Sequence, residues 1–510
     1  MKNKKRIVSL VLSLSLVGSI LTACKSDPTS SPKSDGKNGE VEKVVLALPT
    51  FNNIPQDYSE VEEAINKITE EKINVEVDLQ LYGPADYNQK VNLALQSGEQ
   101  MDLFVSLGNF TTYLSKNQLY PLDGLLEKYG ADTVAILEND FGPNLLKSTT
   151  SNGEIYGIPA NKGMSLPPTF VYNADMLAEV GFSPDDIQSV DDLPAIFEAV
   201  KEKYPDVVPF GPVNVNPSDP GLVRLIKSSA KVDSLTDDTG VGVVIGDSGN
   251  VVNFYETDEF KDGIEMVRGW YEKGYLQKDA ATTTIGMAQM MSSDRGFSFI
   301  AAYGGLEAGK AISAQTGKNI EMKRISPFYF DTSATNAVTW MMSSTTKVPD
   351  AAMKLLNMTY TDKELLNTIL FGIEGRDYEV VDEHHVKYPD GKSAANVPYT
   401  AQLSSGILGS ESLQYQLEGM SYEDVNVKIT ENRETERSPY FGFIFDQTPV
   451  KTELSTINNV VNQYLPGLVT GSLDPETTLP KFIKALNDAG AKNVINEKQK
   501  QLDKWIEDQK

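Results

Sequence analysis

The sequence predicts an α/β protein built as two lobes or domains, and two observations support this. Strand and helix patterns alternate along residues 43–107, which is typical of parallel strands joined by helical crossovers. The chain has 510 residues, of which 40% are hydrophobic, so it is long enough to bury two sizeable cores. Its single cysteine excludes an internal disulfide, so the stability must come from burial.

The N-terminus has the layout of an export signal. A basic head at 1–6 precedes an apolar run at 7–21, which is shorter than the about 20 residues that a membrane span needs. The string Leu-Thr-Ala-Cys that ends at Cys24 resembles a bacterial lipobox, in which cleavage leaves the cysteine N-terminal and its sulfur takes a diacylglycerol. We therefore expect a lipoprotein signal peptide at 1–23, and a lipidated Cys24 with a flexible tether at 24–43. An ordinary cleaved signal with a stray cysteine is the alternative.

The first lobe begins with five alternating elements. KVVLAL at 43–48 indicates a short buried strand, and Ser59 with Glu62 forms a capping-box pattern before a helix. Residues 75–81 alternate strictly between apolar and polar, which predicts a second strand. A second helix then ends near Gly98, and DLFVS at 102–106 is the next buried strand.

Further elements follow the same rules. A helix fits 190–205, and two apolar stretches that flank GDSGN at 246–250 predict a hairpin. Residues 260–274 carry a helical apolar stripe, and 348–372 reads as two linked helices. The last hundred residues end in helices that carry leucine and isoleucine.

The charge excludes one class of partner. The formal net charge is −25, and removal of the basic leader makes the mature chain more acidic still. Such a surface argues against nucleic-acid binding and against electrostatic adhesion to anionic lipid. It does not identify a ligand.

No pattern requires an enzyme, a metal or a cofactor. GDSGN resembles the nucleophile loop of trypsin-like proteases, but the only histidines, His384 and His385, follow it in the chain, where that family needs one before it. These adjacent histidines would point to opposite sides of a strand and lack further ligands nearby. We therefore expect a protein that is not an enzyme and binds no metal or cofactor.

Several segments, in their order, resemble family 1 extracellular solute-binding proteins of bacterial ABC importers. They follow the lipobox and tether, and they cover essentially the whole mature chain: YNQKVNLALQSGEQMDLFVS (87–106), LYPLDGLLEKYG (119–130), GEIYGIPA (153–160), FVYNADMLAEVG (170–181) and VPDAAMKLLNMTYTD (348–362). Residues 365–391 and 440–505 resemble a mostly Gram-positive subgroup with an uncharacterised C-terminal domain, which we expect at about 370–510.

The resemblance implies a two-lobe fold similar to that of periplasmic binding proteins, with a hinge and an interlobe cleft. Lobe one would hold 44–165 and about 315–360, and lobe two would hold 166–314 and about 361–510. The implied function is capture of a sugar or oligosaccharide by lobe closure and its delivery to a membrane permease. We expect a monomer that is lipid-anchored at the extracellular face of the cytoplasmic membrane.

Candidate ligand-binding residues lie where strands end, because ligands of open α/β sheets bind outside the carboxyl ends of the strands. Sugars need aromatic faces for their C–H surfaces and amides for their hydroxyls. The candidates are Phe51, Asn52, Tyr82, Asn109, Phe110, Tyr172, Asn173, Tyr303 and Trp340.

Some of these residues fit packing equally well. Trp340 shares a strand face with Val338 and Met342 that suits a core or a cleft, and Tyr172 fits packing at the hinge. Trp270 and Trp505 lie among helical apolar stripes and are interpreted as core residues. Two other functions stay open: a secreted polysaccharide-processing enzyme, and a partner that presents a ligand to a sensor kinase.

Overall fold

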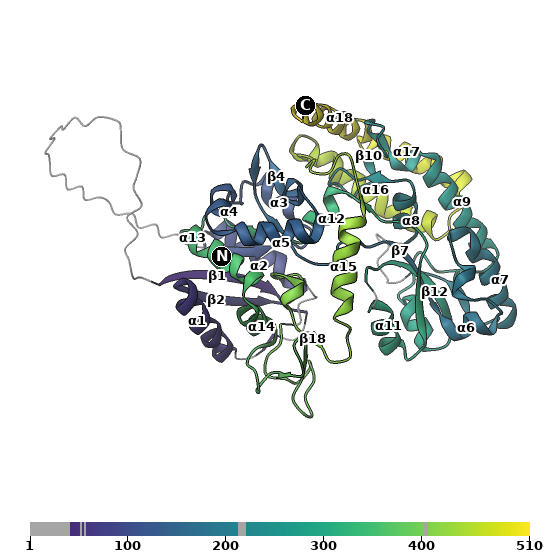
Figure 1. Ribbon diagram of the computed structural model, residues 1–510. Helices are drawn as coiled ribbons and strands as arrows, with labels where there is room; N and C mark the ends of the chain where they lie inside the picture. The colour runs from purple at the N-terminus through teal and green to yellow at the C-terminus, as the bar shows by residue number, and fades with distance from the viewer. Residues whose placement is uncertain are drawn as a thin grey trace, which may run out of the picture. The chain divides into compact units, whose positions relative to one another are not determined.

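The structure is a computed structural model that describes residues 41–51, 54–55, 58–212, 221–305, 307–401 and 406–509 (Figure 1). The predicted leader, Cys24, most of the tether and Asn52 lie outside the described residues. Val41–Lys510 forms one compact unit. Within it, two large hydrophobic clusters surround two separate sheets, which we call lobe one and lobe two. The predicted two-lobe α/β fold is confirmed.

Lobe one is built on a five-stranded sheet. Its strands, in spatial order, are β2 (Val75–Tyr82), β1 (Glu42–Pro49), β3 (Leu103–Val105), β15 (Thr339–Met342) and β6 (Ile158–Pro159). Because β1 pairs in parallel with both β2 and β3, the predicted parallel start is confirmed. The helices of this lobe are α1 (Ser59–Ile73), α2 (Pro84–Ser97), α3 (Phe110–Ser115), α4 (Asp123–Tyr129), α5 (Ala131–Phe141), α13 (Pro349–Thr361) and α14 (Lys363–Phe371).

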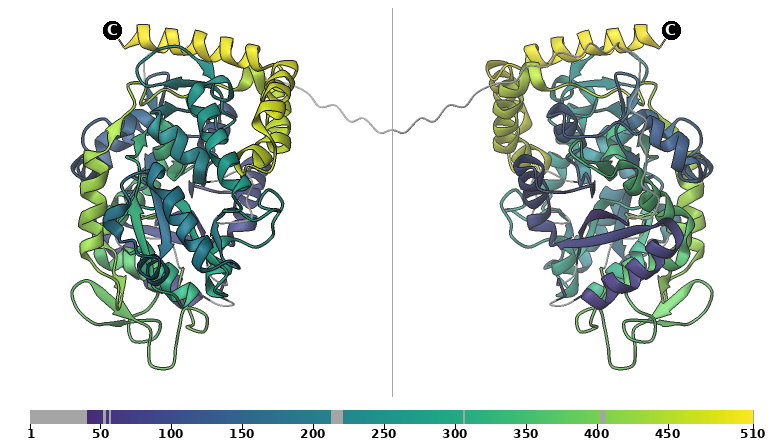
Figure 2. Two further views of the ribbon diagram at one scale, coloured as in Figure 1. Left: turned by 90° about the vertical axis from the view of Figure 1, so that its right-hand side faces the viewer. Right: turned by 90° about the vertical axis from the view of Figure 1, so that its left-hand side faces the viewer.

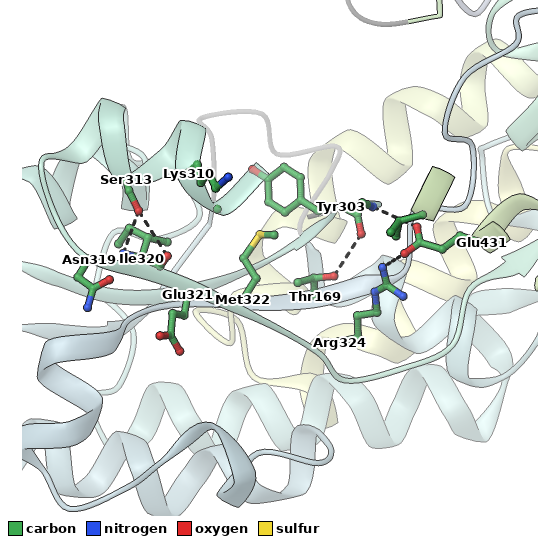
Figure 3. Close-up of a pocket in the computed structure, with 13 residues that line it drawn as sticks. Thr169, Tyr303, Lys310, Ser313, Asn319, Ile320, Glu321, Met322, Arg324 and Glu431 are labelled. Carbon is green, nitrogen blue, oxygen red and sulfur yellow. Dashed lines mark hydrogen bonds and ion pairs between the residues drawn. The ribbon is translucent and has the colours of Figure 1, made fainter. Parts of the chain in front are cut away.

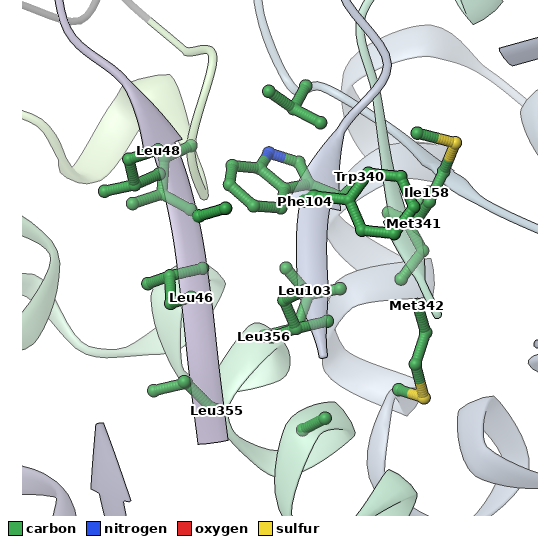
Figure 4. Packing of buried hydrophobic residues seen from close by; sticks show 14 of the residues in the cluster. Leu46, Leu48, Leu103, Phe104, Ile158, Trp340, Met341, Met342, Leu355 and Leu356 are labelled. Carbon is green, nitrogen blue, oxygen red and sulfur yellow. The ribbon is translucent and has the colours of Figure 1, made fainter. Parts of the chain in front are cut away.

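The core of lobe one lies between its sheet and its helices. Figure 4 shows side chains of β1, β3, β15 and β6 meeting leucines of α13, with Trp340 among them. β2 alternates buried and half-buried side chains, as its sequence pattern predicts. The predicted capping box is wrong: α1 begins at Ser59, with Tyr58 as the N-cap. The Glu62 carboxylate instead accepts a hydrogen bond from the backbone N–H of Leu79 at 3.0 Å.

Lobe two combines a mixed sheet with a helical C-terminal region. Its main sheet has the order β13 (Ile320–Arg324), β7 (Pro168–Asn173), β12 (Gly296–Ala302) and β8 (Val208–Phe210). A small sheet holds β9 (Val232–Asp233), β10 (Val241–Ile245) and β11 (Val252–Asn253), and its antiparallel β10–β11 pair confirms the predicted hairpin. The helices are α6 (Ala174–Glu179), α7 (Leu193–Lys203), α8 (Gly221–Ser229), α9 (Asp258–Glu272), α10 (Met287–Ser292), α11 (Ala308–Thr316), α16 (Lys451–Val469), α17 (Pro475–Asp488) and α18 (Ala491–Asp508).

Two segments lie in the lobe opposite to the expected one. Residues 320–324 were expected in lobe one, but β13 pairs antiparallel with β7 in the lobe-two sheet. Residues from about 361 were expected in lobe two, but α14 packs against α1, and its apolar face joins the core of lobe one. Lys72 reinforces this packing with ion pairs to Asp362 at 2.7 Å and Glu364 at 3.1 Å.

The chain passes between the two cores at about 164–170, 325–330 and 438–443. The second and third passages are linked, because β14 (Tyr329–Phe330) runs parallel to β19 (Glu436–Arg437), which directly precedes the third passage. They are flanked by α12 (Thr332–Asn336) and by α15 (Glu423–Glu434), the helix that precedes the last passage. In the side views of Figure 2, α15 runs along one edge and α18 runs across the top.

Candidate functional site

The carboxyl ends of β1 and β2 present two of the predicted residues. Thr50 is fixed in place, since its N–H donates to the Tyr82 carbonyl at 2.8 Å and its hydroxyl donates to the Ala401 carbonyl at 2.8 Å. The next residue, Phe51, is 47% exposed. Tyr82 is half-buried, and its hydroxyl donates to Gln80 Oε1 at 2.6 Å. Phe51 therefore offers an accessible ring, and Tyr82 offers a partly accessible one.

The carboxyl end of β3 presents Asn109. Leu107 and Gly108 both have positive φ, 39° and 84°, so the backbone turns sharply between β3 and α3. Asn109 is half-buried at the N-cap of α3, and its amide donates only a long hydrogen bond, 3.4 Å, to the Leu107 carbonyl.

Four predicted residues are instead buried in this structure. Phe110 is 1% exposed in the core of lobe one. Trp340 is fully buried, and its indole N–H donates to the Ile407 carbonyl at 2.6 Å. Tyr172 is fully buried, stacks on Phe170 and donates to Glu321 at 3.1 Å. Asn173 caps α6 through the Met176 N–H at 3.1 Å. Packing and capping account for these four side chains.

Tyr303 lies in a cavity of about 700 Å³ that is formed by α11, β13 and α15 (Figure 3). Its neighbours there are mostly charged or polar. Arg324 forms an ion pair with Glu431 of α15, and Glu431 also accepts from the Gly305 N–H at 3.1 Å. Partial burial raises the pKa of the Tyr303 phenol and lowers the pKa of the Arg324 guanidinium. Some of the polar side chains of this cavity are thus already engaged in interactions within the protein.

A larger cavity, of about 1160 Å³, is lined by both lobes. We call it the interlobe cavity. The lobe-one wall comes from α3 and from the hairpin of β4 (Thr150–Ser151) and β5 (Glu154–Ile155), and it includes Tyr156. The lobe-two wall comes from residues 442–448 and from α18. The cavity brings aromatic rings, amides, hydroxyls, carboxylates and ammonium groups together, a mixture that suits a polyhydroxylated solute.

The aromatic residues of the interlobe cavity are not among the candidate ligand-binding residues predicted from the sequence. Trp505 was interpreted as a core residue; it contacts Phe443 edge-on with ring centroids 6.0 Å apart, but it is only half-buried and lines the cavity. Tyr156 was not singled out, although it lies within GEIYGIPA. Position in the family pattern was the available signal for Tyr156, whereas no signal in the sequence brings it close to Trp505.

Among the residues that the structure describes, no cluster of histidine, cysteine, aspartate and glutamate could hold a metal ion. Within the same ranges, none of the helices combines the length and hydropathy of a membrane span.

Two α/β lobes, several chain passages between them and a cavity lined from both sides define a two-lobe solute-binding fold. The chain belongs to the family described as bacterial extracellular solute-binding protein, whose model matches residues 63–370. A second match, to a domain of unknown function (DUF3502), covers residues 439–507, a shorter range than the expected 370–510.

Relatives of this chain are named as carbohydrate-binding or solute-transport proteins. A carbohydrate ABC transporter substrate-binding protein of Streptococcus pneumoniae serotype 4 is 29% identical, with 100% of each chain covered. An arabinooligosaccharide-binding protein of Bacillus subtilis is 27% identical over 42% of this chain and 46% of its own length. The solved N-glycan transport solute binding protein (NgtS) of S. pneumoniae is 28% identical over 92% of this chain and 100% of that chain, with a TM-score of 0.75. The structure of its complex with Man5GlcNAc has a TM-score of 0.66 and covers 92% of this chain and 99% of that chain.

Proposed function

We propose that this protein is the solute-binding component of an ABC importer and that it captures an oligosaccharide between its two lobes. The observation that carries the proposal is the interlobe cavity, in which Tyr156 and Trp505 come from opposite lobes and polar groups surround them. A solute that contacts both walls favours the closed arrangement of the lobes, because its contacts offset the cost of ordering them. The names of the full-length relatives support a carbohydrate as the solute.

We further propose that the predicted residues at the strand ends also contact the solute. Phe51 offers an exposed ring, Asn109 offers an amide with only a weak internal hydrogen bond, and Tyr82 and Tyr303 offer half-buried phenols. Asn52 belongs to this set by its sequence position after β1.

The remaining proposals concern location and partners. We propose that a lipid on Cys24 holds the protein at the extracellular face of the cytoplasmic membrane, where a tether raises its effective concentration near a permease. Membership of an extracellular family and similarity to lipoprotein LipO of B. subtilis, 26% identical over 53% of the chain, support this. A labelled fatty acid should be incorporated into the wild type and not into a Cys24→Ser variant; a wild type that takes up no label would contradict lipid anchoring at Cys24.

Calorimetry tests the ligand class. Protein that begins at Val41 is titrated with arabino-oligosaccharides, fructo-oligosaccharides, Man5GlcNAc and a peptide mixture, since residues 41–510 form a compact unit. We expect heat with at least one glycan and none with peptides. Heat with peptides alone would overturn the carbohydrate assignment. Shortening of a glycan during incubation would indicate an enzyme instead.

A further inference from the structure

All of helix α18 except its last residue, Asp508, lies within the domain of unknown function, and two faces of the helix contact different parts of the molecule. One face is buried against lobe two through Val494, Lys498 and Leu502. The other face lines the interlobe cavity through Gln501, Lys504, Trp505 and Asp508. These four residues follow the spacing i, i+3, i+4 and i+7, which places them on one side of a helix.

The buried face holds α18 firmly against lobe two. Lys498 is fully buried, and its ammonium group forms an ion pair with Asp237 at 2.9 Å. It also donates to the Gly242 carbonyl at 2.8 Å and to the Val241 carbonyl at 3.2 Å. Gly242 has a φ of 83°, and a Cβ there would lie 2.6 Å from the Lys498 side chain, so the β10 backbone needs glycine at this point. The cavity face of α18 is therefore presented in a fixed position.

Hydrogen bonds from α18 also fix the rim of the cavity. Gln501 accepts a hydrogen bond from the Asp446 N–H at 2.9 Å, and its amide donates to the Asp446 carbonyl at 3.0 Å. Gln501 is thus a positioning residue that holds the 442–448 segment. Trp505 stands one turn further along, half-buried against Phe443.

The opposite wall offers a matching surface. Tyr156 is half-buried, and its hydroxyl donates to Glu154 at 2.7 Å, which orients the ring. The charged side chains along the cavity are Lys147, Lys504, Asp446 and Asp508, so positive and negative groups are equal in number. A wall with balanced charge and aromatic rings suits a neutral oligosaccharide better than one built from uronic acids.

From these observations we infer that α18 forms the lobe-two wall of the glycan site and that Trp505 stacks on a ring of a neutral oligosaccharide. The inference rests on the proposed function, and it assigns ligand recognition to the domain of unknown function. Lys504 and Asp508 supply hydrogen bonds to hydroxyl groups beside the stacked ring.

The three tryptophans allow a direct test. Trp270 and Trp340 are 3% and 0% exposed, whereas Trp505 is half-buried at the cavity, so a bound glycan should change the emission of Trp505 alone. The oligosaccharide that gives heat in calorimetry is titrated against wild type, W505F and W505A, with emission and heat recorded in parallel. Melting temperatures verify that each variant is folded.

In the wild type, the emission change should saturate with the dissociation constant that calorimetry gives. W505A should bind about tenfold more weakly, because it loses a stacking surface. W505F should lose the emission change and lose less affinity than W505A, since it keeps a ring. Lys504→Ala tests a second, exposed residue of the cavity, and its affinity for the glycan should fall about threefold. Lys500→Ala is the matched control, because Lys500 lies on α18 outside the cavity and should leave the affinity unchanged.

Three results would overturn the inference. If the emission change persists in W505F, the glycan binds elsewhere. If both W505A and Lys504→Ala keep the affinity of the wild type, the glycan likewise binds elsewhere. Preference for an oligogalacturonate over every neutral glycan contradicts the charge argument. Absence of heat with all glycans for the wild type would instead reject the proposed function and this inference with it.

Discussion

Helix α15 lines the cavity around Tyr303, and helix α18 lines the interlobe cavity. The two helices are attached to the lobes in different ways. α15 reaches both lobes through polar side chains: Arg433 donates to the Asn139 carbonyl of lobe one, and Glu431 pairs with Arg324 of lobe two. α18 packs on lobe two alone with apolar residues and the buried Lys498. Of these two helices, α18 therefore belongs rigidly to one lobe, whereas α15 bridges both.

One lysine on each helix, Lys428 of α15 and Lys498 of α18, shows how differently the two helices are held. The Lys428 side chain of α15 is 19% exposed and lies 2.9 Å from Glu411 and 2.8 Å from Asp424. Although burial disfavours its charge, these carboxylates hold the pKa of Lys428 above its usual value. Burial instead lowers the pKa of Lys498, in spite of Asp237. Lys428 thus keeps partial access to water beside two buried carboxylates, whereas Lys498 is fully buried and fixes one arrangement.

The largest effect is expected for Lys498→Met. The change leaves Asp237 buried without its counter-ion, so the free energy of unfolding should fall by about 3–5 kcal/mol. Urea titration measures this loss. Lys500→Met on the exposed side of α18 should change stability by less than about 1 kcal/mol. Equal effects of the two variants would show that α18 is not anchored by its buried lysine.

A pH dependence should follow from a carboxylate near the same anchor. Burial and the nearby Asp331 raise the pKa of Asp233 from 3.8 to about 7; Lys498 opposes this shift, and Ser438 and the Leu235 N–H donate to the carboxylate. Between these pH values the Asp233 carboxyl is ionised in the unfolded chain, whereas it keeps its proton in the folded protein. The free energy of unfolding should therefore fall as the pH rises from about 4 to about 7, by up to about 1.4 kcal/mol per pH unit.

Denaturation at a series of pH values measures this slope, and Asp233→Asn should flatten it. The variant keeps an amide in place of the carboxyl group, so its slope should be smaller than that of the wild type, and the slope that remains is due to Asp331, whose pKa burial also raises. A slope that is unchanged in Asp233→Asn would assign the dependence to other groups.

On the α15 side, Asn432→Ala should have a smaller effect. Asn432 is 1% exposed; its side-chain oxygen accepts from the Met164 N–H at 2.9 Å and the Ser165 N–H at 3.1 Å, and its amide donates to the Lys162 carbonyl. Loss of these partners should reduce the free energy of unfolding by about 1–3 kcal/mol. Asn426→Ala, at an exposed position of the same helix, serves as the control in the same urea titration. An equal loss in both variants would contradict a specific role for Asn432.

The smallest effect is expected for Arg324→Ala. The Arg324 side chain is 46% exposed, so its pair with Glu431 contributes at most about 1 kcal/mol. Because the pair joins lobe two to α15, its loss should shift the glycan dissociation constant by less than about fivefold, as measured by calorimetry. A larger shift would mean that α15, and not only α18, controls the ligand site.

Much of the fold could be predicted from local sequence patterns. The strands expected at 43–48 and 75–81 appear as β1 and β2, because each pattern reflects burial on one or both faces of a sheet. The lobe boundaries were less accurate. α14 and β13 have patterns that fit either lobe, and only their long-range packing decides between them.

The ligand contacts were harder to predict, for a physical reason. All four residues of β15 and all six of β7 are buried, so the alternation that separates core from cleft is absent around Trp340 and Tyr172. Trp505 has the opposite problem: its apolar neighbours on α18 predict packing, and only the fold of the distant hairpin creates a cavity beside it.

The parallel pair β14–β19 has a mechanical consequence. The ladder consists of two residue pairs, Tyr329 with Glu436 and Phe330 with Arg437, whereas β7 and β12 share five. A torsion applied at this narrow joint would strain few backbone hydrogen bonds, while the wider ladders inside each lobe resist the same twist. A rotation of the lobes at this pair would therefore disturb few backbone hydrogen bonds.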